Sequence, residues 1–188
     1  MYETSDFKKG LKIMVEGNPY VIVDFQHVKP GKGNQFSRTK MRALLTGQNL
    51  ERTFKSGEKF EVPNVENIEM TYLYKDDNGF NFMNQVNFEQ ISMMEHEVGE
   101  ATNFLIENLV VNILLYNEKA VLVDVPKAVN MKVAFTEPGI KGDRVTGATK
   151  QAKMETGLVV NVPLHINEGD LLRIDTTESV YVERVSQK

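Results

Sequence analysis

Short strand-like segments separated by turn residues constrain the fold of this chain more than any other feature. Runs rich in β-branched and aromatic residues, such as residues 19–27, recur along the whole length, with Gly, Asn and Pro between them. Only residues 88–105 have a pattern compatible with a helix, and Gly99 interrupts it. We therefore expect an all-β protein built from small barrels or sandwiches.

The predicted strands fall into three units, which the 188 residues of the chain are long enough to form. A turn at Pro63 closes the first unit, and Pro126 closes the second. We expect three small β domains in series, at residues 1–64, 65–128 and 129–188. Strands are predicted at residues 11–15, 19–27, 35–43, 50–54, 68–74, 80–83, 112–116, 120–125, 131–135, 158–163, 171–174 and 181–185.

Charge is distributed unevenly over these units, although the formal net charge is only −4. Residues 1–64 hold 11 Lys and Arg against 7 Asp and Glu, residues 65–128 hold 3 against 11, and residues 129–188 hold 8 against 8. A basic first unit followed by an acidic second one suits a protein that touches RNA at one end only. An accidental skew among three domains would look the same, so the charge supports that interpretation without establishing it.

Composition excludes several other classes of protein. Cysteine is absent, which excludes disulfides, thiolate metal sites and cysteine nucleophiles. No apolar run approaches the ~18 residues that a membrane span needs, and the N-terminal residues are too polar and acidic for a signal peptide. We therefore expect a cytoplasmic protein with no membrane association.

The most distinctive turn, at residues 28–34, connects two predicted strands. Pro30 presets φ for one corner, and Gly31 is expected to take a positive φ at the next. Lys32 stands between two glycines at the tip, where no neighbouring side chain pairs with it, and its long side chain can extend beyond the backbone. The candidate site is therefore Lys32, together with the other loop residues Lys29, Pro30, Gly31, Gly33 and Asn34.

Basic residues continue along the strand that follows this turn. Arg38, Lys40 and Arg42 recur at every second position and therefore share one face of a strand. From Lys29 to Arg42 there are five basic residues and no acidic one. The pattern fits a solvated hairpin with a charged outer face. It also fits a basic arm that contacts phosphates and carries one lysine into a deep site, and the local pattern does not choose between them.

The sequence lacks the convergent side chains of an enzyme. His27, His96 and His165 are isolated, and none has a partner at metal-ligand spacing. Residues 31–33 are not a phosphate loop, because no Ser or Thr follows the lysine and a strand comes next. Residues 76–79 lack the distant Glu of a calcium loop and favour a hairpin turn. We expect no enzymatic activity, no metal and no cofactor, and binding is the better class.

Several motifs resemble those of the bacterial translation elongation factor P family, in the same order. They include Val-Lys-Pro-Gly-Lys-Gly at residues 28–33 and Arg-Thr-Phe-Lys-Ser at residues 52–56 in the first unit, and Thr-Tyr-Leu-Tyr at residues 71–74 in the second. In the third unit the family signature K-x-A-x4-G-x2-V-x-V-P-x2-I-x2-G matches residues 150–169 at every fixed position. The resemblance covers essentially the whole chain.

Two stretches of the third unit stand apart. Where the family often has Asp-Thr-Arg, then Ser or Thr, then Gly, this chain has Thr177 in place of the arginine and Ser179 two residues later. A contact made by that arginine would be lost. The polar connection from Thr136 to Thr149 is longer than most loops and is expected to be either mobile or functional.

The resemblance implies both a fold and a function. It implies an SH3-like first domain and two OB-fold domains, arranged in an L shape like that of a transfer RNA. It also implies binding to the ribosome between the P and E sites, beside the peptidyl-tRNA, with large-subunit rRNA near the peptidyl-transferase centre and E-site ribosomal proteins as partners. Lys32 occupies the position that many family members modify, so a lysine-modifying enzyme is a further expected partner. We expect a monomer.

In that setting the two groups of basic residues would have different roles. Lys32 would hold the acceptor end of a prolyl-tRNA and so relieve stalling at consecutive prolines. Arg38, Lys40 and Arg42 would bind RNA backbone with salt-dependent affinity.

Two other interpretations stay open from the sequence. The hypusine-containing factor of archaea and eukaryotes shares the lysine hairpin, but it resembles only two of the three units. A plain OB-type RNA-binding protein would stack bases on exposed aromatic side chains. Against the latter, four aromatic residues of the second unit alternate as barrel-core residues would: Tyr72, Tyr74, Phe80 and Phe82.

Overall fold

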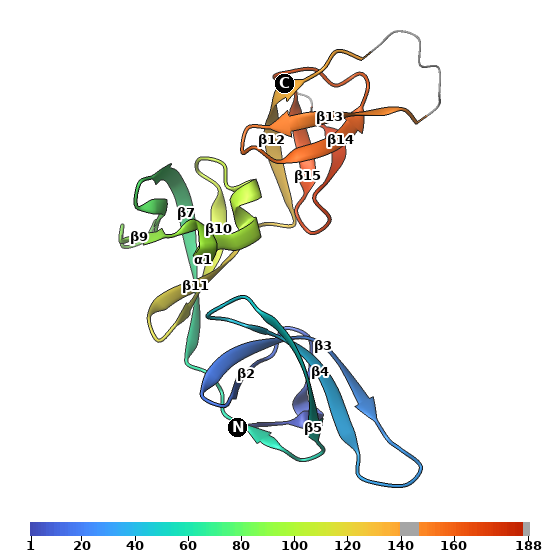
Figure 1. Cartoon of the computed structure of the whole chain (residues 1–188). Coiled ribbons are helices and arrows are strands. Elements are labelled where there is room, and N and C mark those ends of the chain that lie inside the picture. The colour runs from blue at the N-terminus through green and yellow to red at the C-terminus, as the bar shows by residue number, and fades with distance from the viewer. Residues whose placement is uncertain (140–146, 186–188) are drawn as a thin grey trace. The chain divides into compact units, whose positions relative to one another are not determined.

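A computed structural model describes residues 1–139 and 147–185, which fold into sixteen strands and three short helical segments (Figure 1). The all-β prediction is confirmed. Within these residues, no helix combines the length and the apolar character that crossing a membrane demands. The elements are β1 (Tyr2–Glu3), η1 (Thr4–Asp6), β2 (Lys12–Val15), β3 (Asn18–Val28), β4 (Phe36–Ala43), β5 (Asn49–Lys55), β6 (Lys59–Phe60), β7 (Val65–Asp76), β8 (Gly79–Met83), β9 (Gln90–Met93), α1 (Glu95–Val98), η2 (Gly99–Phe104), β10 (Val110–Tyr116), β11 (Lys119–Asp124), β12 (Ala128–Thr136), β13 (Thr149–Met154), β14 (Val159–Pro163), β15 (Leu171–Asp175) and β16 (Val180–Arg184), where η denotes a 3-10 helix.

Contacts between residues group the chain into two compact units. The first comprises Met1–Glu66 with Leu114–Leu122, and the second comprises Asn67–Ile113 with the chain from Val123 onward. The division into three domains at residues 64 and 128 therefore stays a prediction.

The N-terminal sheet has the strand order β2-β3-β4-β5, with every neighbouring pair antiparallel. Its core is aromatic at one side, where the rings of Phe7, Phe54 and Phe60 lie with centroids 4.8 to 6.0 Å apart. Ile22 and Met41 fill the core between β3 and β4 and are almost fully buried. This packing fixes the two strands that carry the lysine loop.

The middle sheet has the order β11-β10-β7-β8-β9. Tyr72, Phe80 and Phe82 are buried as predicted, but the same prediction is wrong for Tyr74, which is 53% exposed. The cause is a β-bulge, since the register between β7 and β8 shifts between Tyr72 and Tyr74. An extra residue in one strand reverses the face on which the following side chains lie.

The turn between β7 and β8 confirms the predicted hairpin at residues 76–79. Gly79 has φ +109°, and a Cβ on it would collide with the backbone carbonyl of Met93. Only glycine permits this close approach of β9 to the turn.

The helix predicted at residues 88–105 is wrong in its first part. Residues 90–93 form the edge strand β9, in which exposed Gln90 and Ser92 alternate with the partly or fully buried Ile91 and Met93. The apolar residues therefore follow the two-residue period of a strand. Helical structure begins only at α1, which Gly99 ends with φ +65°.

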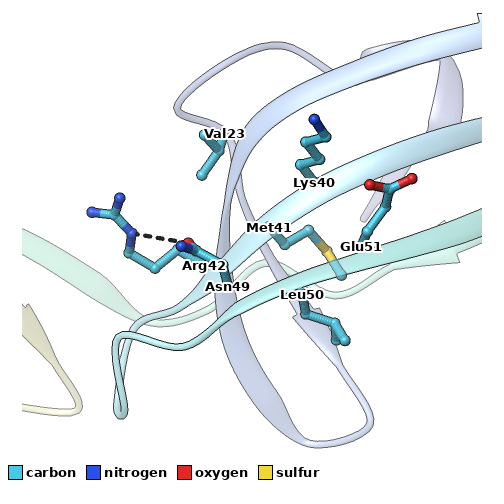
Figure 2. A pocket seen from close by; sticks show the side chains of 7 residues that line it. All are labelled: Val23, Lys40, Met41, Arg42, Asn49, Leu50 and Glu51. Carbon is cyan, nitrogen blue, oxygen red and sulfur yellow. Dashed lines mark hydrogen bonds between the residues drawn. The ribbon is translucent and has the colours of Figure 1, made fainter.

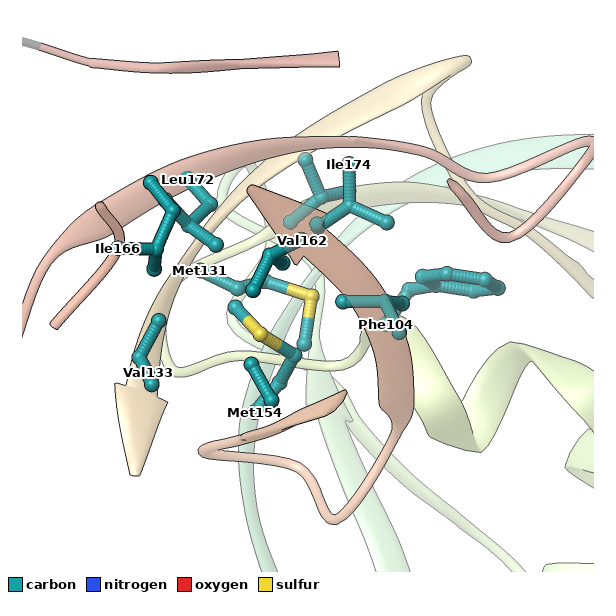
Figure 3. Packing of buried hydrophobic residues seen from close by; sticks show 11 residues of the cluster. Phe104, Met131, Val133, Met154, Val162, Ile166, Leu172 and Ile174 are labelled. Carbon is teal, nitrogen blue, oxygen red and sulfur yellow. The ribbon is translucent and has the colours of Figure 1, made fainter. Parts of the chain in front are cut away.

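The C-terminal sheet has the order β14-β13-β12-β15-β16 and encloses the core shown in Figure 3. Met131 and Met154 occupy its centre, and Phe104 of η2 enters the same core from outside the sheet. Strand β13 was not predicted, because its sequence is mostly polar. Only two of its six residues, Ala152 and Met154, are buried. Of the long connection predicted from Thr136 to Thr149, residues 140–146 lie outside the described residues.

Candidate functional site

The lysine loop lies at the end of a long hairpin. Strands β3 and β4 pair from Tyr20 and Ala43 to Val28 and Phe36, and Figure 1 shows the hairpin extending away from the rest of the N-terminal sheet. Every residue from 29 to 35 is exposed. The hairpin confirms the predicted strand–turn–strand arrangement.

Polar contacts lie at the loop end of this hairpin. Ser37 and Thr39 are almost fully buried, and their hydroxyl oxygens lie 3.4 Å apart. The backbone N–H of Ser56 donates to the carbonyl oxygen of Gln35 with an N–O distance of 3.0 Å. The last loop residue is thus tied to the turn after β5, so the loop projects from a fixed base.

Lys32 makes no hydrogen bond or ion pair with any residue in the described part of the chain, and it is exposed. The prediction of a positive φ at Gly31 is wrong, because the left-handed residue is Gly33, with φ +115°. The chain reverses on the far side of the lysine. A side chain at position 33 would be strained in this conformation.

Arg38, Lys40 and Arg42 lie on one face of β4, as their spacing predicts. All three are exposed, while Ser37, Thr39 and Met41 between them are buried on the opposite face. Acidic and polar groups from the neighbouring strands share the exposed face, because β4 pairs with both β3 and β5. Asp24 of β3 and Glu51 of β5 are the cross-strand partners of Lys40. A carboxylate oxygen of Glu51 also lies 3.8 Å from the Arg38 Nε. Asn49 is the partner of Arg42, and its Oδ1 accepts a hydrogen bond from the Arg42 Nε at 3.4 Å.

The interpretation of a basic arm considered only residues 29–42 and so left out Asp24 and Glu51, which the sequence shows merely as two of the seven acids of residues 1–64. The strand register is the signal that would have found them, because it places Asp24 and Glu51 on either side of Lys40. The ammonium of Lys9, 3.3 Å from the Asp24 carboxylate, holds the pKa of Asp24 below its usual value, mainly by a hydrogen bond. Lys40 itself forms no salt bridge with a described residue. Its charge is therefore available to a ligand.

A shallow pocket of about 390 Å³ opens on this face (Figure 2). Lys40, Arg42 and Glu51 form its charged rim, and Val23 and Leu50, each roughly two-fifths exposed, add apolar surface. The register between β3 and β4 shifts at Val23, and this bulge accounts for its exposure. Cations beside an apolar surface suit a phosphate together with a base or ribose.

A second hollow of about 320 Å³ lies at the loop end of the hairpin. Val28 and Phe36 form part of its lining, together with the polar side chains of His27, Lys29, Gln35 and Ser56. These side chains offer hydrogen-bond donors to an anionic or polyhydroxyl ligand. In the described part of the chain, no group of three His, Cys, Asp or Glu side chains is arranged to hold a metal ion.

The fold and the site together define a modular all-β protein that presents Lys32, without a described partner, at the end of a hairpin whose second strand carries basic residues. Three family models match the chain in succession: the elongation factor P KOW-like domain over residues 3–60, the elongation factor P OB domain over residues 65–123, and the elongation factor P C-terminal domain over residues 129–184. The chain belongs to the elongation factor P family.

Curated relatives agree with these models over the full length. Elongation factor P of Bdellovibrio bacteriovorus is 77% identical over 188 residues and covers 100% of both chains. Elongation factor P 2 of Geobacter sulfurreducens is 48% identical over 185 residues, 98% of this chain and 99% of its own. The chain is thus a translation elongation factor and not an enzyme, with a KOW-like N-terminal domain and two OB-type domains. Family membership also implies that it binds the ribosome.

One solved structure shares part of the fold. Translation initiation factor 5A from Methanococcus jannaschii superimposes with a TM-score of 0.50 at 21% sequence identity. The match covers 94% of that chain but only 65% of this one. The likeness therefore shows a shared fold over about two thirds of this chain and nothing more.

Proposed function

We propose that the chain binds the ribosome between the P and E sites and stimulates peptide-bond formation at consecutive prolines. Lys32, placed against the acceptor end of the peptidyl-tRNA, carries this function. The observation that supports it most is that Lys32 is exposed, has no described partner, and stands on a hairpin loop whose last residue, Gln35, is hydrogen-bonded to Ser56.

The action of Lys32 is positional. Proline is a conformationally restricted peptidyl donor and acceptor. The acceptor end of a prolyl-tRNA therefore spends more time away from the reactive geometry. A fixed ammonium that contacts the terminal nucleotides reduces this disorder before the reaction rather than during it. No acid, base or metal of the factor is needed for that effect.

Arg38, Lys40 and Arg42 bind RNA backbone in this proposal. They face the solvent on one side of β4, and the pocket beside Lys40 offers apolar surface for a sugar or base. The partners are large-subunit rRNA near the peptidyl-transferase centre and the P-site peptidyl-tRNA. Asp24 and Glu51 lower the positive charge of this face, which limits binding to other RNA.

The exposed Lys32 is also open to a modifying enzyme. A group added to its Nζ would lengthen a side chain that already projects beyond the loop, and it would displace no contact with a described residue. We therefore place the chain among lysine-bearing factors, either modified or unmodified, and not among those with arginine at this position.

A tethered cleavage probe tests this placement. The chain has no cysteine, so Lys32→Cys creates a single attachment point for an iron chelate that generates hydroxyl radicals. On ribosomes carrying peptidyl-tRNA, the probe at position 32 should cut the acceptor end of the P-site tRNA and nearby large-subunit rRNA. The control is Lys8→Cys, at another exposed lysine, between η1 and β2. Identical cleavage from both positions would contradict the proposal.

A further inference from the structure

The loop between β8 and β9, residues 84–89, exposes two apolar side chains that the proposed function does not use. Val86 is 89% exposed and Phe88 is 66% exposed. Strand β9, which follows directly, is the edge strand of the middle sheet, so no further strand of the described residues covers the loop on that side. Two large apolar groups this exposed on one short loop are unusual on a protein surface.

Hydrogen bonds within the loop fix its shape. The N–H of Phe88 donates to the carbonyl oxygen of Asn84 at 2.8 Å, and the N–H of Asn84 donates to that of Glu89 at 2.9 Å. The side-chain oxygens of Asn84 and Asn87 accept from the N–H groups of Val86 and Glu89 at 2.9 and 3.0 Å. The apolar pair is therefore presented on a preformed loop, and binding would cost little ordering entropy.

The backbone of Phe88 is strained. Its φ of +61° lies in the left-handed region, where bulky aromatic residues are rare. Glycine or asparagine would adopt this conformation with little strain. Strain of this kind persists where the surrounding structure enforces it, and it accumulates at functional positions. In this loop the strained backbone directs the Phe88 ring outward. A relaxed backbone would place the ring elsewhere.

Charge selects the kind of partner. Residues 65–124 contain eleven Asp and Glu but only two lysines, and Glu89 adjoins the ring of Phe88 in sequence. The ammonium of Lys75 lies 3.1 Å from a Glu95 carboxylate oxygen and 5.0 Å from the Phe80 ring centroid, so its charge is already engaged. Phosphates would be repelled from such a surface, whereas Lys and Arg would be attracted.

We propose that Val86 and Phe88 dock into an apolar pocket on a basic protein surface. This inference rests on the proposed function, which puts the chain on the ribosome, and the partner that the charge favours there is a basic ribosomal protein rather than rRNA. The rigid loop fills the pocket, and Glu89, next to Phe88 in the sequence, pairs with the basic rim of the partner.

Crosslinking identifies the partner. Because the chain has no cysteine, Val86→Cys accepts a single benzophenone maleimide, and the matched control is Val110→Cys, at a 47% exposed position of the same sheet. On purified ribosomes the probe at position 86 should crosslink to a Lys- and Arg-rich ribosomal protein, and the probe at position 110 should not crosslink to the same protein. Crosslinks from position 86 to rRNA alone, or equal crosslinks from both positions, would overturn the inference.

Phe88→Asn separates docking from folding, because asparagine tolerates the left-handed backbone and removes the ring. We expect about tenfold weaker binding to purified ribosomes with no loss of stability against urea, the size typical of an aromatic anchor. Val110→Ser should bind as the unsubstituted chain does. Equal binding by Phe88→Asn would overturn the docking inference alone. Failure of the unsubstituted chain to bind would instead contradict the proposed function and, with it, this inference.

Discussion

Tyr72 and Tyr74 show how a one-residue β-bulge decides whether a side chain is buried or exposed. Both look like core residues in the sequence, yet Tyr72 is 7% exposed and Tyr74 is 53% exposed. Alternation predicts which residues share a face only while the register is regular. A bulge leaves no mark in the local composition, so this error could not be avoided from the sequence.

The buried Tyr72 should make stability depend on alkaline pH. Burial raises the pKa of the Tyr72 phenol above its usual value. Its folded pKa then exceeds its unfolded pKa, so its contribution is complete below the unfolded pKa and is lost as the pH rises through the folded pKa. As the pH rises through the usual tyrosine pKa of about 10, the unfolding free energy of Tyr72→Phe should therefore fall less than that of the unsubstituted chain.

Urea unfolding across this pH range measures the difference, and Tyr74→Phe is the control. Tyr74 is 53% exposed, so its replacement removes a tyrosine hydroxyl from the surface and leaves the buried Tyr72 in place. The interpretation is wrong if both substitutions change the alkaline loss of stability equally.

At the scale of elements, strand β4 could be predicted from the sequence because one of its faces is apolar or small and the other is basic. Apolar or small residues alternate with Arg38, Lys40 and Arg42, and the structure keeps that alternation. The acids opposite them come from other strands, at distances in sequence that no local pattern reports. The sequence thus reveals the cations of the surface, but the net charge of the surface depends on the register.

Lys40 should contribute more to ribosome binding than Arg38, because the Arg38 Nε already lies 3.8 Å from a Glu51 oxygen. Replacing Lys40 with Gln should weaken binding and reduce the slope of log K against log salt concentration by about one, the value for one lost phosphate contact. Arg38→Gln should reduce the slope less, and Lys8→Gln should not change it. Affinities at several salt concentrations provide the slopes, and an unchanged slope for Lys40→Gln would exclude its phosphate contact.

At the scale of the whole molecule, contacts between distant segments were beyond prediction. Phe104 belongs to η2 but is 3% exposed within the C-terminal core, and the Thr156 hydroxyl donates to the carbonyl oxygen of Asn103 at 2.6 Å. The sequence shows only the end of an expected helix there. The family resemblance supplied the order of domains and the role proposed for Lys32, which local physics left open.

Loss of the Phe104 ring should cost about 3–5 kcal/mol of stability, the range for a buried phenylalanine cut to alanine. Phe135→Ala is the matched control, since Phe135 is 57% exposed, and surface changes of this kind usually stay within about 0.5 kcal/mol. Denaturation in guanidinium chloride compares the two. Similar small losses from both variants would mean that Phe104 does not stabilise the C-terminal core.

The central claim is that Lys32 accelerates peptide-bond formation at prolines, and single-turnover kinetics test it most directly. Ribosomes stalled at consecutive prolines receive protein purified from its native cells, unmodified recombinant protein, or Lys32→Ala, each at saturating concentration. We predict rates that fall in that order, with no comparable difference on a template without prolines. A Lys32→Ala rate equal to that of the unsubstituted protein would contradict the account.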